Sequence, residues 1–347
     1  MKNLLICFGG QSSEYAVSLM SACSVLENLS ADKYNVIKLG ITKSGEWFIT
    51  DASPLMIKED RWLCANIKKA ALLPTGEGVL AVFDNDKYEK IKIDVIFPVM
   101  HGEMCEDGCI QGVFEMAGVP YVGPGVLSSA VCMDKGYAKA VLAAAGIPQV
   151  DFVLAEKGNE DKAARETEEK FIYPVFVKPC NAGSSVGTAK AVDRESLYRA
   201  LEAAMKVDTR VLIEEYIDAR EIECAVLEDG GKICPSTLGE ITPANEFYDY
   251  EAKYIKGDSV LKIPAPVTGE EKNTIQQLAV KAFNATGCRG MARVDFFISK
   301  KDNKIYLNEI NTLPGFTSIS MYPKLRMAEG VTYSRLIDIL IENASLK

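Results

Sequence analysis

The stretch Ala292-Arg-Val-Asp-Phe-Phe-Ile298, followed after five residues by Lys304-Ile-Tyr-Leu-Asn-Glu-Ile310, alternates apolar and polar side chains as two β-strands do. The connecting residues, Ser-Lys-Lys-Asp-Asn at 299–303, are typical of a hairpin loop. A turn centred near Asp302 pairs Asp295 with Glu309 and Arg293 with Asn311. Because side chains alternate between the two faces of a strand, all four then lie on one face of the sheet.

This pairing predicts a metal site. Two carboxylates directly opposite each other on neighbouring strands lie roughly 4.5–5.5 Å apart and repel unless a cation joins them. Asp295, Glu309 and Asn311 offer only oxygen ligands, the kind that Mg²⁺ prefers. A solvated hairpin face is the commoner explanation of such a pattern. We favour the metal because the run 308–311 (Asn-Glu-Ile-Asn) stands beside Arg293 and Asp295.

The composition is that of an ordinary globular protein. The 347 residues are enough for two or three domains, and 48% of them are hydrophobic and 25% charged. No apolar run approaches the roughly 18 residues of a membrane span. With 39 Lys and Arg against 48 Asp and Glu, the net charge of −9 has the wrong sign for binding a nucleic-acid backbone. We therefore expect a small-molecule partner, with no nucleic acid and no membrane.

The N-terminal segment and the cysteines both lead us to expect a cytoplasmic protein. The apolar stretch at residues 1–8 stops at Gly9-Gly10 and is too short for the core of a signal peptide. The ten cysteines form no C-x-x-C pair, and a single histidine, His101, is available to join them in a zinc site. We expect reduced, mostly buried thiols.

The order of predicted elements indicates an α/β fold of three domains. We expect strands at 3–8, 34–41, 94–100, 119–125, 173–178, 211–216 and 221–227, and helices at 13–29, 112–118, 128–145, 194–205 and 270–285. The first of these alternate as in an open α/β layer. Dense turn residues at 123–125 indicate the end of an N-terminal domain, 1–123, and we place a central domain at 124–214 and a C-terminal one at 215–347. A weakly patterned stretch at about 239–266 is expected to be a mobile loop.

A second candidate site follows the strand at 173–178. The sequence from Lys178 to Gly187 (Lys-Pro-Cys-Asn-Ala-Gly-Ser-Ser-Val-Gly) combines glycines, two hydroxyls and a lysine, which together can cover a polyphosphate. A plain turn is the alternative. Neither a P-loop nor a dinucleotide-binding glycine motif occurs in the chain.

Four further residues are candidates on weaker grounds. Glu214 and Glu221 stand at strand ends, where they accept hydrogen bonds from ribose hydroxyls or simply face water. Glu14 opens a helix after Ser12-Ser13, so the helix dipole is a sufficient reason for it, and binding an ammonium is the alternative. His101 follows a buried strand, at the edge where parallel sheets bind ligands, although a lone histidine is more often structural.

Taken in order, these motifs resemble the D-alanine:D-alanine ligases of the ATP-grasp superfamily, and the resemblance runs from Gly9 to the C-terminal helix. The motifs that carry it are His101-Gly-Glu-Met-Cys-Glu-Asp-Gly108 with Gln111-Gly112, Met133-Asp-Lys135, Lys178-Pro179 with Gly183-Ser-Ser-Val-Gly187, Phe247-Tyr-Asp-Tyr-Glu-Ala-Lys-Tyr254, Ala292-Arg-Val-Asp295 and Asn308-Glu-Ile-Asn-Thr-Leu-Pro-Gly315. One departure is Cys105, where the family pattern usually has glycine.

The resemblance implies a three-domain ATP-grasp fold that joins two D-alanines, both substrates, into D-alanyl-D-alanine for peptidoglycan precursors. ATP would lie between the central and C-terminal domains, with two Mg²⁺ ions, or Mn²⁺ in their place, on the predicted ligands. By the same resemblance, Lys135, Lys178 and Lys253 would contact phosphate, and Glu214 and Glu221 would bind the adenine and ribose. It also implies a homodimer.

The resemblance also assigns the two chemical steps. The first D-alanine carboxylate attacks the γ-phosphate, and the second D-alanine amine then attacks the acyl phosphate. Five residues would serve these steps: Glu14 would bind the first ammonium, Ser184 and Tyr254 would link it to the closed loop, and Arg293 with the N–H of Gly315 would stabilise the oxyanion. His101, Ser320 and Met321 would bind substrate.

The residues at the second-substrate segment favour D-alanine as the second substrate. Met321 and Tyr254 match the dipeptide-forming members, so we expect D-alanine over D-lactate, with D-serine less strictly excluded because an apolar pocket discriminates weakly against a hydroxyl. The alternatives are a D-alanine:D-serine ligase, another ATP-dependent carboxylate–amine ligase, and a nucleotide-binding regulatory protein on a degenerate scaffold. Retention of Asp295, Glu309 and Arg293 argues against the last.

Overall fold

The computed structural model describes residues 1–30, 32–183, 185–242 and 260–344. Its strands are β1 Lys2–Gly9, β2 Tyr34–Ile41, β3 Trp47–Thr50, β4 Ile67–Leu72, β5 Val79–Asp84, β6 Lys87–Lys92, β7 Val95–Pro98, β8 Phe152–Glu156, β9 Val175–Pro179, β10 Ala189–Ala191, β11 Arg210–Glu215, β12 Ala219–Asp229, β13 Lys232–Thr242, β14 Val260–Lys262, β15 Met291–Ser299 and β16 Ile305–Asn311. Its helices are α1 Tyr15–Asn28, α2 Pro54–Lys58, α3 Cys109–Ala117, α4 Val126–Met133, α5 Lys135–Ala144, α6 Glu160–Lys170, α7 Arg194–Ala204, α8 Gly269–Ala285, α9 Met321–Met327 and α10 Tyr333–Glu342, with a 3-10 turn at Trp62–Cys64.

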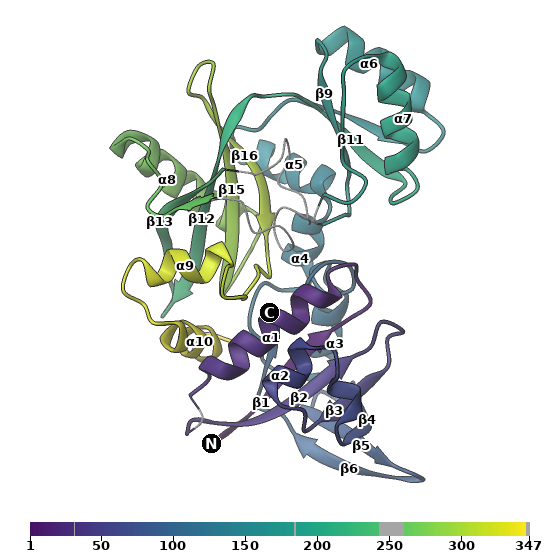
Figure 1. The fold of residues 1–347 in the computed structure, drawn as a ribbon, viewed down its shortest axis with the longest axis vertical. Coiled ribbons are helices and arrows are strands. Elements are labelled where there is room, and N and C mark those ends of the chain that lie inside the picture. Colours follow the sequence, from purple (N-terminus) through teal and green to yellow (C-terminus); the bar gives the residue numbers. More distant parts are fainter. Residues whose placement is uncertain (31, 184, 243–259, 345–347) are drawn as a thin grey trace.

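The strands form three sheets with helices packed on them, which confirms the predicted α/β class. Their orders are β6-β5-β4-β3-β2-β1-β7, β10-β9-β11-β8 and β14-β13-β12-β15-β16. In Figure 1 the first sheet occupies the lower part, the second lies at upper right with α6 and α7, and the third lies at upper left beside α8. Apart from the last residue of β11, each sheet falls within one of the three predicted ranges, and the boundaries themselves stay a prediction.

The N-terminal sheet is parallel only at one end, where β7 is the last strand. β1 pairs in parallel with β2 and β7, whereas β3 to β6 extend the sheet in antiparallel fashion. Leu4, Leu5 and Ile6 of β1 have no exposed surface, as expected for a parallel strand covered on both faces. The carboxyl ends of β1 and β7 share one edge, so Glu14 and His101 begin their respective segments close to each other.

Two predicted elements differ in the structure. The single helix expected at 128–145 is two helices, because Asp134 leaves the helical conformation and its side chain accepts a hydrogen bond from the N–H of Tyr137 at the start of α5. The strand expected at 119–125 is one isolated bridge, between Ile96 and Tyr121. Beyond it, Gly123 adopts a φ of 97°, which turns the chain out of the sheet.

Part of the stretch expected to be a mobile loop, about 239–266, is β-strand among the described residues. β13 continues to Thr242 and β14 begins at Val260, and the two strands pair through Ile241 and Leu261. Ile241 is buried in the core, which explains why regular pairing continues this far. Residues 243–259 lie outside the described residues.

The C-terminal helices pack on the N-terminal domain. One apolar cluster joins Leu19 of α1 with Phe316, Tyr322 of α9 and Leu340 of α10. Asp338 is buried beside this cluster and accepts hydrogen bonds from Lys33 (2.5 Å) and Tyr34 (3.0 Å). The loop between β16 and α9 is thereby held against α1.

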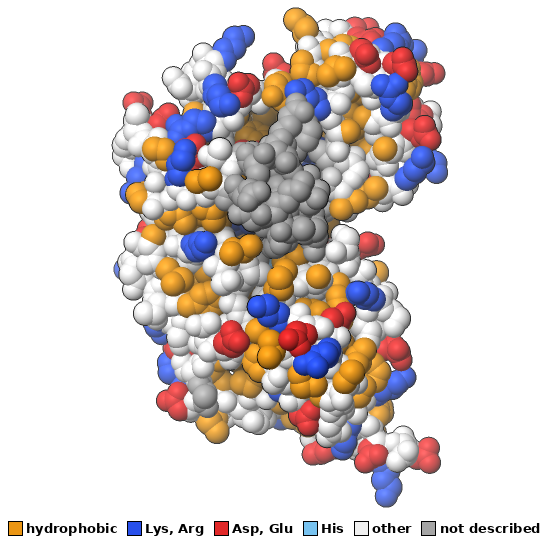
Figure 2. All heavy atoms as spheres, in the orientation of Figure 1, with side chains coloured by type: hydrophobic (Ala, Val, Ile, Leu, Met, Phe, Trp, Pro, Cys, Tyr) orange, Lys and Arg blue, Asp and Glu red, His pale blue; other side chains and the backbone are white. Residues whose placement is uncertain are grey.

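The surface carries charges of both signs. On the face shown in Figure 2, Lys and Arg side chains are interspersed with Asp and Glu rather than gathered into a basic stripe. Among the described residues, no helix combines the length and the apolar character needed to cross a bilayer.

Candidate active site

A polar pocket lies where the three sheets meet. It encloses about 210 Å³ and is lined from the start of α1, the loop after β7, the ends of α4 and α5, and β9, β12, β15 and β16. Among the predicted site residues, it brings together Glu14, His101, Lys135, Lys178, Glu221, Arg293, Asp295, Glu309, Asn311 and Gly315. Residues more than 290 positions apart in the sequence thus face one cavity.

The predicted pairing across the hairpin is confirmed. Asp295 of β15 faces Glu309 of β16, and Arg293 faces Asn311. The neighbouring strand β12 adds Glu223 opposite Asp295, so three carboxylates form a row across three strands. Glu223 is a site residue that we did not predict. Pairing the alternating run of β12 with that of β15 would have placed it opposite Asp295.

A β-bulge adjusts which side chains reach the pocket. The register shifts between Asp295 and Phe296, so that Phe296 pairs with Leu307 and Asn308 becomes the extra residue. Leu307 and Ile310 both enter the apolar core, whereas Asn308 and Glu309 both line the pocket. Strict alternation along β16 would put Asn308 on the core side, and the bulge brings it to the pocket instead.

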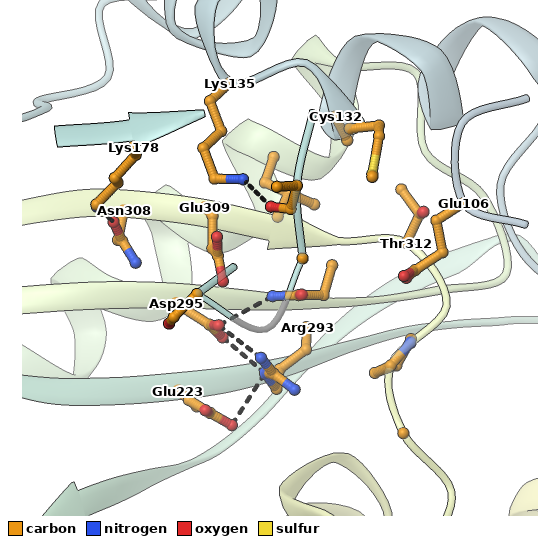
Figure 3. Close-up of a pocket in the computed structure, with 18 of the residues that line it drawn as sticks. Glu106, Cys132, Lys135, Lys178, Glu223, Arg293, Asp295, Asn308, Glu309 and Thr312 are labelled. Carbon is orange, nitrogen blue, oxygen red and sulfur yellow. Dashed lines mark hydrogen bonds and ion pairs between the residues drawn. The ribbon is translucent and has the colours of Figure 1, made fainter. Parts of the chain in front are cut away.

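Arg293 is the cation at the centre of the carboxylate row (Figure 3). Its Nε and Nη2 donate to the two oxygens of Asp295 at 2.8 and 2.7 Å, and Nε lies 3.0 Å from Glu223 Oε2. Burial alone would lower the pKa of Arg293, but the two carboxylates raise it well above its usual value. The guanidinium is therefore permanently charged and held from two strands.

The hairpin fits a divalent cation by its donor chemistry. Asp295, Glu309 and Asn311 present carboxylate and amide oxygens to one cavity, and Asn311 donates to Asp295 Oδ2 at 2.9 Å. Among the described residues, no group of three or more His, Cys, Asp and Glu side chains gathers as a metal site. Mg²⁺ is typically bound by one or two protein carboxylates, and phosphate oxygens and water complete its coordination. The two carboxylates and the amide of the hairpin fit this pattern.

Lys178 is paired with Glu214 inside the protein. Lys178 Nζ lies 2.7 Å from Glu214 Oε2 and 3.3 Å from Asn308 Oδ1, and Lys139 Nζ lies 2.8 Å from Glu214 Oε1. Burial would raise the pKa of Glu214, but the two lysines lower it to about 2. Glu214 thus lies behind Lys178 and is not among the described residues that line the pocket. Lys139 is a buried partner of Glu214 that we did not predict from the sequence.

Lys135 reaches the glycine-rich loop from the start of α5. Its Nζ donates to the carbonyl of Ala182 at 2.7 Å (Figure 3), and its backbone N–H donates to Cys180 O at 3.1 Å. Asp134, which caps α5, also pairs with Arg210 of β11. The helix start and the predicted phosphate loop are therefore held together as one unit.

Glu14 faces this loop from the other side of the pocket. It is the N-cap residue of α1, at φ −92°, so the helix begins at Tyr15, two residues later than expected. A Cβ placed on Gly183 would stand 2.8 Å from Glu14 Oε2, and one on Gly102 would stand 2.9 Å from the same oxygen. The carboxylate is thus packed between two glycines that leave it room.

The loop after β7 carries two titratable side chains that line the pocket, the buried His101 and the half-buried Glu106. His101 Nδ1 lies 3.0 Å from Leu313 O and Nε2 lies 3.1 Å from Ser21 Oγ, and burial lowers the pKa of the imidazole. Glu106 accepts from Gly102 N at 2.7 Å and from Leu313 N at 3.2 Å. Burial, followed by the charge of Glu14, raises the pKa of Glu106 to about 8. Glu106 lines the pocket and was not among the predicted site residues.

Cys105, the departure from the family pattern, does not line the pocket among the described residues. Its side chain is fully buried in an apolar cluster, and a Cβ on Gly10 would lie 3.1 Å from its Sγ. The thiol therefore occupies core space beneath the loop that carries His101 and Glu106.

The predicted second-substrate segment lies at the start of α9. Ser320 is the N-cap residue and its Oγ accepts from the N–H of Thr317 at 3.0 Å. Met321 is 5% exposed, and a Cβ on Gly239 would come within 2.6 Å of its Sδ. Neither Ser320 nor Met321 is among the described residues that line the pocket, so their substrate role stays a prediction.

Three predicted site residues, Ser184, Lys253 and Tyr254, lie outside the described residues. Their roles stay predictions.

Family models match both halves of the chain. Residues 3–124 match "D-ala D-ala ligase N-terminus" and residues 141–342 match "D-ala D-ala ligase C-terminus". The chain belongs to the D-alanine–D-alanine ligase family. The D-alanine–D-alanine ligase of Acetivibrio thermocellus is 49% identical to it, over 99% of this chain and 96% of that protein. The ligase of the same name from Clostridium acetobutylicum is 48% identical, over 99% and 98%.

Solved structures of this family share the fold. The VanG D-Ala:D-Ser ligase from Enterococcus faecalis is 39% identical with a TM-score of 0.90, and the match covers 98% of each chain. The D-alanine-D-alanine ligase from Coxiella burnetii is 33% identical with a TM-score of 0.85, over 99% of this chain and 93% of that one. These likenesses confirm the predicted ATP-grasp fold and family.

Proposed function

We propose that this protein joins two D-alanines into D-alanyl-D-alanine at the expense of ATP, for peptidoglycan precursor synthesis. The observation that carries the proposal is the convergence of Glu14, Lys178 and the Asp295–Glu309 pair on one pocket. A carboxylate suited to an ammonium, a lysine suited to phosphate, and oxygen ligands suited to a divalent cation are the three elements that such a ligation needs. Membership of the D-alanine–D-alanine ligase family supports the same activity.

In the proposed first step, the carboxylate of one D-alanine attacks the γ-phosphorus of ATP and ADP leaves, which produces an acyl phosphate. Glu14 holds the ammonium of this D-alanine, and Lys135 and Lys178 neutralise the phosphates. Glu221 contacts the ribose, and Glu214 becomes available to the adenine as Lys178 turns toward phosphate. Lys253 is proposed as a further phosphate contact. Asp295, Glu309 and Asn311 would hold two Mg²⁺ ions, or Mn²⁺, which supply positive charge at the transferring group.

In the second step, the amine of the other D-alanine bonds to the acyl carbon, the amine loses a proton, and the C–O bond to phosphate breaks. Arg293 and the N–H of Gly315 stabilise the oxyanion of the tetrahedral intermediate. Ser184 and Tyr254 are proposed to connect Glu14 to the loop over the site, and His101, Ser320 and Met321 to bind substrate. Exclusion of water at this stage protects the acyl phosphate from hydrolysis.

The experiment that tests the proposal is a competition assay. The protein receives ATP, Mg²⁺ and equal D-alanine, D-serine and D-lactate, and the products are identified by mass. We expect D-alanyl-D-alanine as the main product, because Met321 offers an apolar wall without a donor for a hydroxyl. Phosphate release without dependence on D-alanine would contradict the proposal and favour a ligase for another acid.

A D-alanine:D-serine ligase is the second candidate, and the likeness to the VanG D-Ala:D-Ser ligase favours it. A majority of D-alanyl-D-serine in the same assay would establish it. We further propose a cytoplasmic homodimer; light scattering on the purified chain tests the dimer, and a monomer would exclude it.

A further inference from the structure

The backbone of one residue, Leu313, is held from both sides by a single loop. Its carbonyl oxygen lies 3.0 Å from His101 Nδ1, and its N–H donates to Glu106 Oε1 at 3.2 Å. Because a carbonyl oxygen only accepts, Nδ1 of His101 carries the proton. Glu106 uses its other oxygen to accept from Gly102 N at 2.7 Å. The two oxygens of the Glu106 carboxyl group therefore connect the N-terminal loop to the segment after β16.

Phe316, three residues further on, is held in the same way. Its N–H donates to Ser21 Oγ at 3.3 Å, and its carbonyl accepts from the hydroxyl of Tyr333. Ser21 Oγ also lies 3.1 Å from His101 Nε2, which accepts because the proton of the neutral imidazole is on Nδ1. The Ser21 hydroxyl thus accepts from Phe316 N and donates to His101 Nε2.

Pro314 and Gly315 lie between these two fixed residues. Both line the pocket, and within the described residues the N–H of Gly315 has no hydrogen-bond partner. Proline has no N–H, so Gly315 offers the free backbone donor of this two-residue segment. An unpartnered N–H at a pocket wall is what an oxyanion donor requires before substrate binds.

We propose that Glu106 is a positioning residue that fixes the N–H of Gly315 for the amine-attack step, with Ser21 as the second anchor of the segment. The proposal rests on the proposed ligase function. Glu106 and Ser21 belong to the N-terminal domain, whereas Gly315 follows the last strand of the C-terminal sheet. The N-terminal domain thereby sets the position of a donor that acts beside Arg293, and it acts on the second step alone.

The test variant is Glu106→Gln. Glutamine keeps the size of the side chain but has one accepting oxygen, so it can satisfy Gly102 N or Leu313 N but not both. The matched control is Asp107→Asn in the same loop, because Asp107 also accepts from two backbone N–H groups, Met104 N at 2.7 Å and Cys109 N at 3.0 Å, with no bond to Leu313.

Three measurements separate the two steps from folding. Dipeptide turnover reports the whole reaction, positional isotope exchange within ATP at low D-alanine reports acyl-phosphate formation, and amide hydrogen exchange of the 313–316 segment reports its mobility. For Glu106→Gln we expect turnover to fall on the order of 10²-fold, the typical loss for an oxyanion donor, with isotope exchange largely kept and faster amide exchange. For Asp107→Asn we expect wild-type values in all three.

Ser21→Ala gives an independent test at the other end of the segment and decides the matter if Glu106→Gln does not fold. It removes the acceptor of Phe316 N, and we expect the same pattern with a turnover loss of about tenfold. Equal losses in isotope exchange and turnover, or variants that match Asp107→Asn, would overturn the positioning role. Absence of dipeptide from the wild type would instead contradict the proposed function.

Discussion

Glu214 Oε2 lies 2.7 Å from Lys178 Nζ while Glu214 Oε1 lies 2.8 Å from Lys139 Nζ, so one buried carboxylate pairs with the buried Lys139 and with the half-buried Lys178. Of these three described residues, Lys178 alone lines the pocket. If Lys178 turns toward phosphate, Lys139 still compensates the charge of Glu214. The arrangement holds Lys178, the proposed phosphate contact, in place without leaving Glu214 unpaired if the lysine moves.

Glu214→Gln should destabilise the fold, because it leaves the buried Lys139 and the half-buried Lys178 without a counter-charge. Breaking a buried ion pair from one side typically costs about 3–5 kcal/mol. Urea denaturation measures the loss. Glu215→Gln, one residue further at an exposed position, is the matched control and should change stability little. The double variant Glu214→Gln with Lys139→Met should recover part of the loss, and a double variant less stable than the single one would contradict the assignment.

Glu309→Gln should abolish ligation while the protein still folds. The variant removes one of the two facing carboxylates, so repulsion from Asp295 falls and the metal-binding charge is lost. We expect a melting temperature no lower than that of the wild type in the absence of magnesium, together with loss of Mg²⁺-dependent turnover. Asp302→Asn, at the turn of the same hairpin, controls for effects on the hairpin itself. Near-normal turnover of Glu309→Gln would remove the metal assignment.

Gly183→Ala should weaken binding of the first D-alanine. A Cβ at this position would stand 2.8 Å from Glu14 Oε2, so the carboxylate or the loop must shift. We expect the KM for D-alanine to rise on the order of tenfold, equivalent to about 1.4 kcal/mol, with ATP affinity less affected. Gly112→Ala in α3 is the control, because a Cβ there meets nothing within 4 Å. An unchanged KM would contradict the ammonium-binding role of Glu14.

Glu106 should make stability fall as the pH rises toward 8. Burial and the charge of Glu14 raise the pKa of Glu106 to about 8, against the opposing effects of the Gly102 and Leu313 N–H groups and Arg293. Between its ordinary value and 8 the unfolded state binds fewer protons than the folded state, so unfolding becomes easier with increasing pH. Glu106→Gln removes this dependence. The variant should therefore be more stable relative to the wild type near pH 8.5 than near pH 5. Equal differences in unfolding free energy at the two pH values would contradict the shift in pKa.

Local patterns determined the hairpin. The period of two along a strand and the short turn between 299 and 303 were enough to pair Asp295 with Glu309, because both act within about twenty residues. The same logic could not find the bulge at Asn308, since the shift depends on which apolar side chains, Leu307 and Ile310, the core accepts. Local pattern also missed the break at Asp134, where a capping side chain interrupts an otherwise helical run.

By itself, the sequence determined the α/β class and the family, because these depend on residue type, on periodicity and on the order of short motifs, and it suggested which residues bind phosphate and metal. Only the tertiary structure decided which of them meet. Glu106 contacts Leu313 across 207 residues and Lys178 contacts Asn308 across 130. No periodicity spans such separations: the positions of Lys139, Glu223 and Glu106 follow from how three sheets pack against one another, and packing depends on the whole core at once.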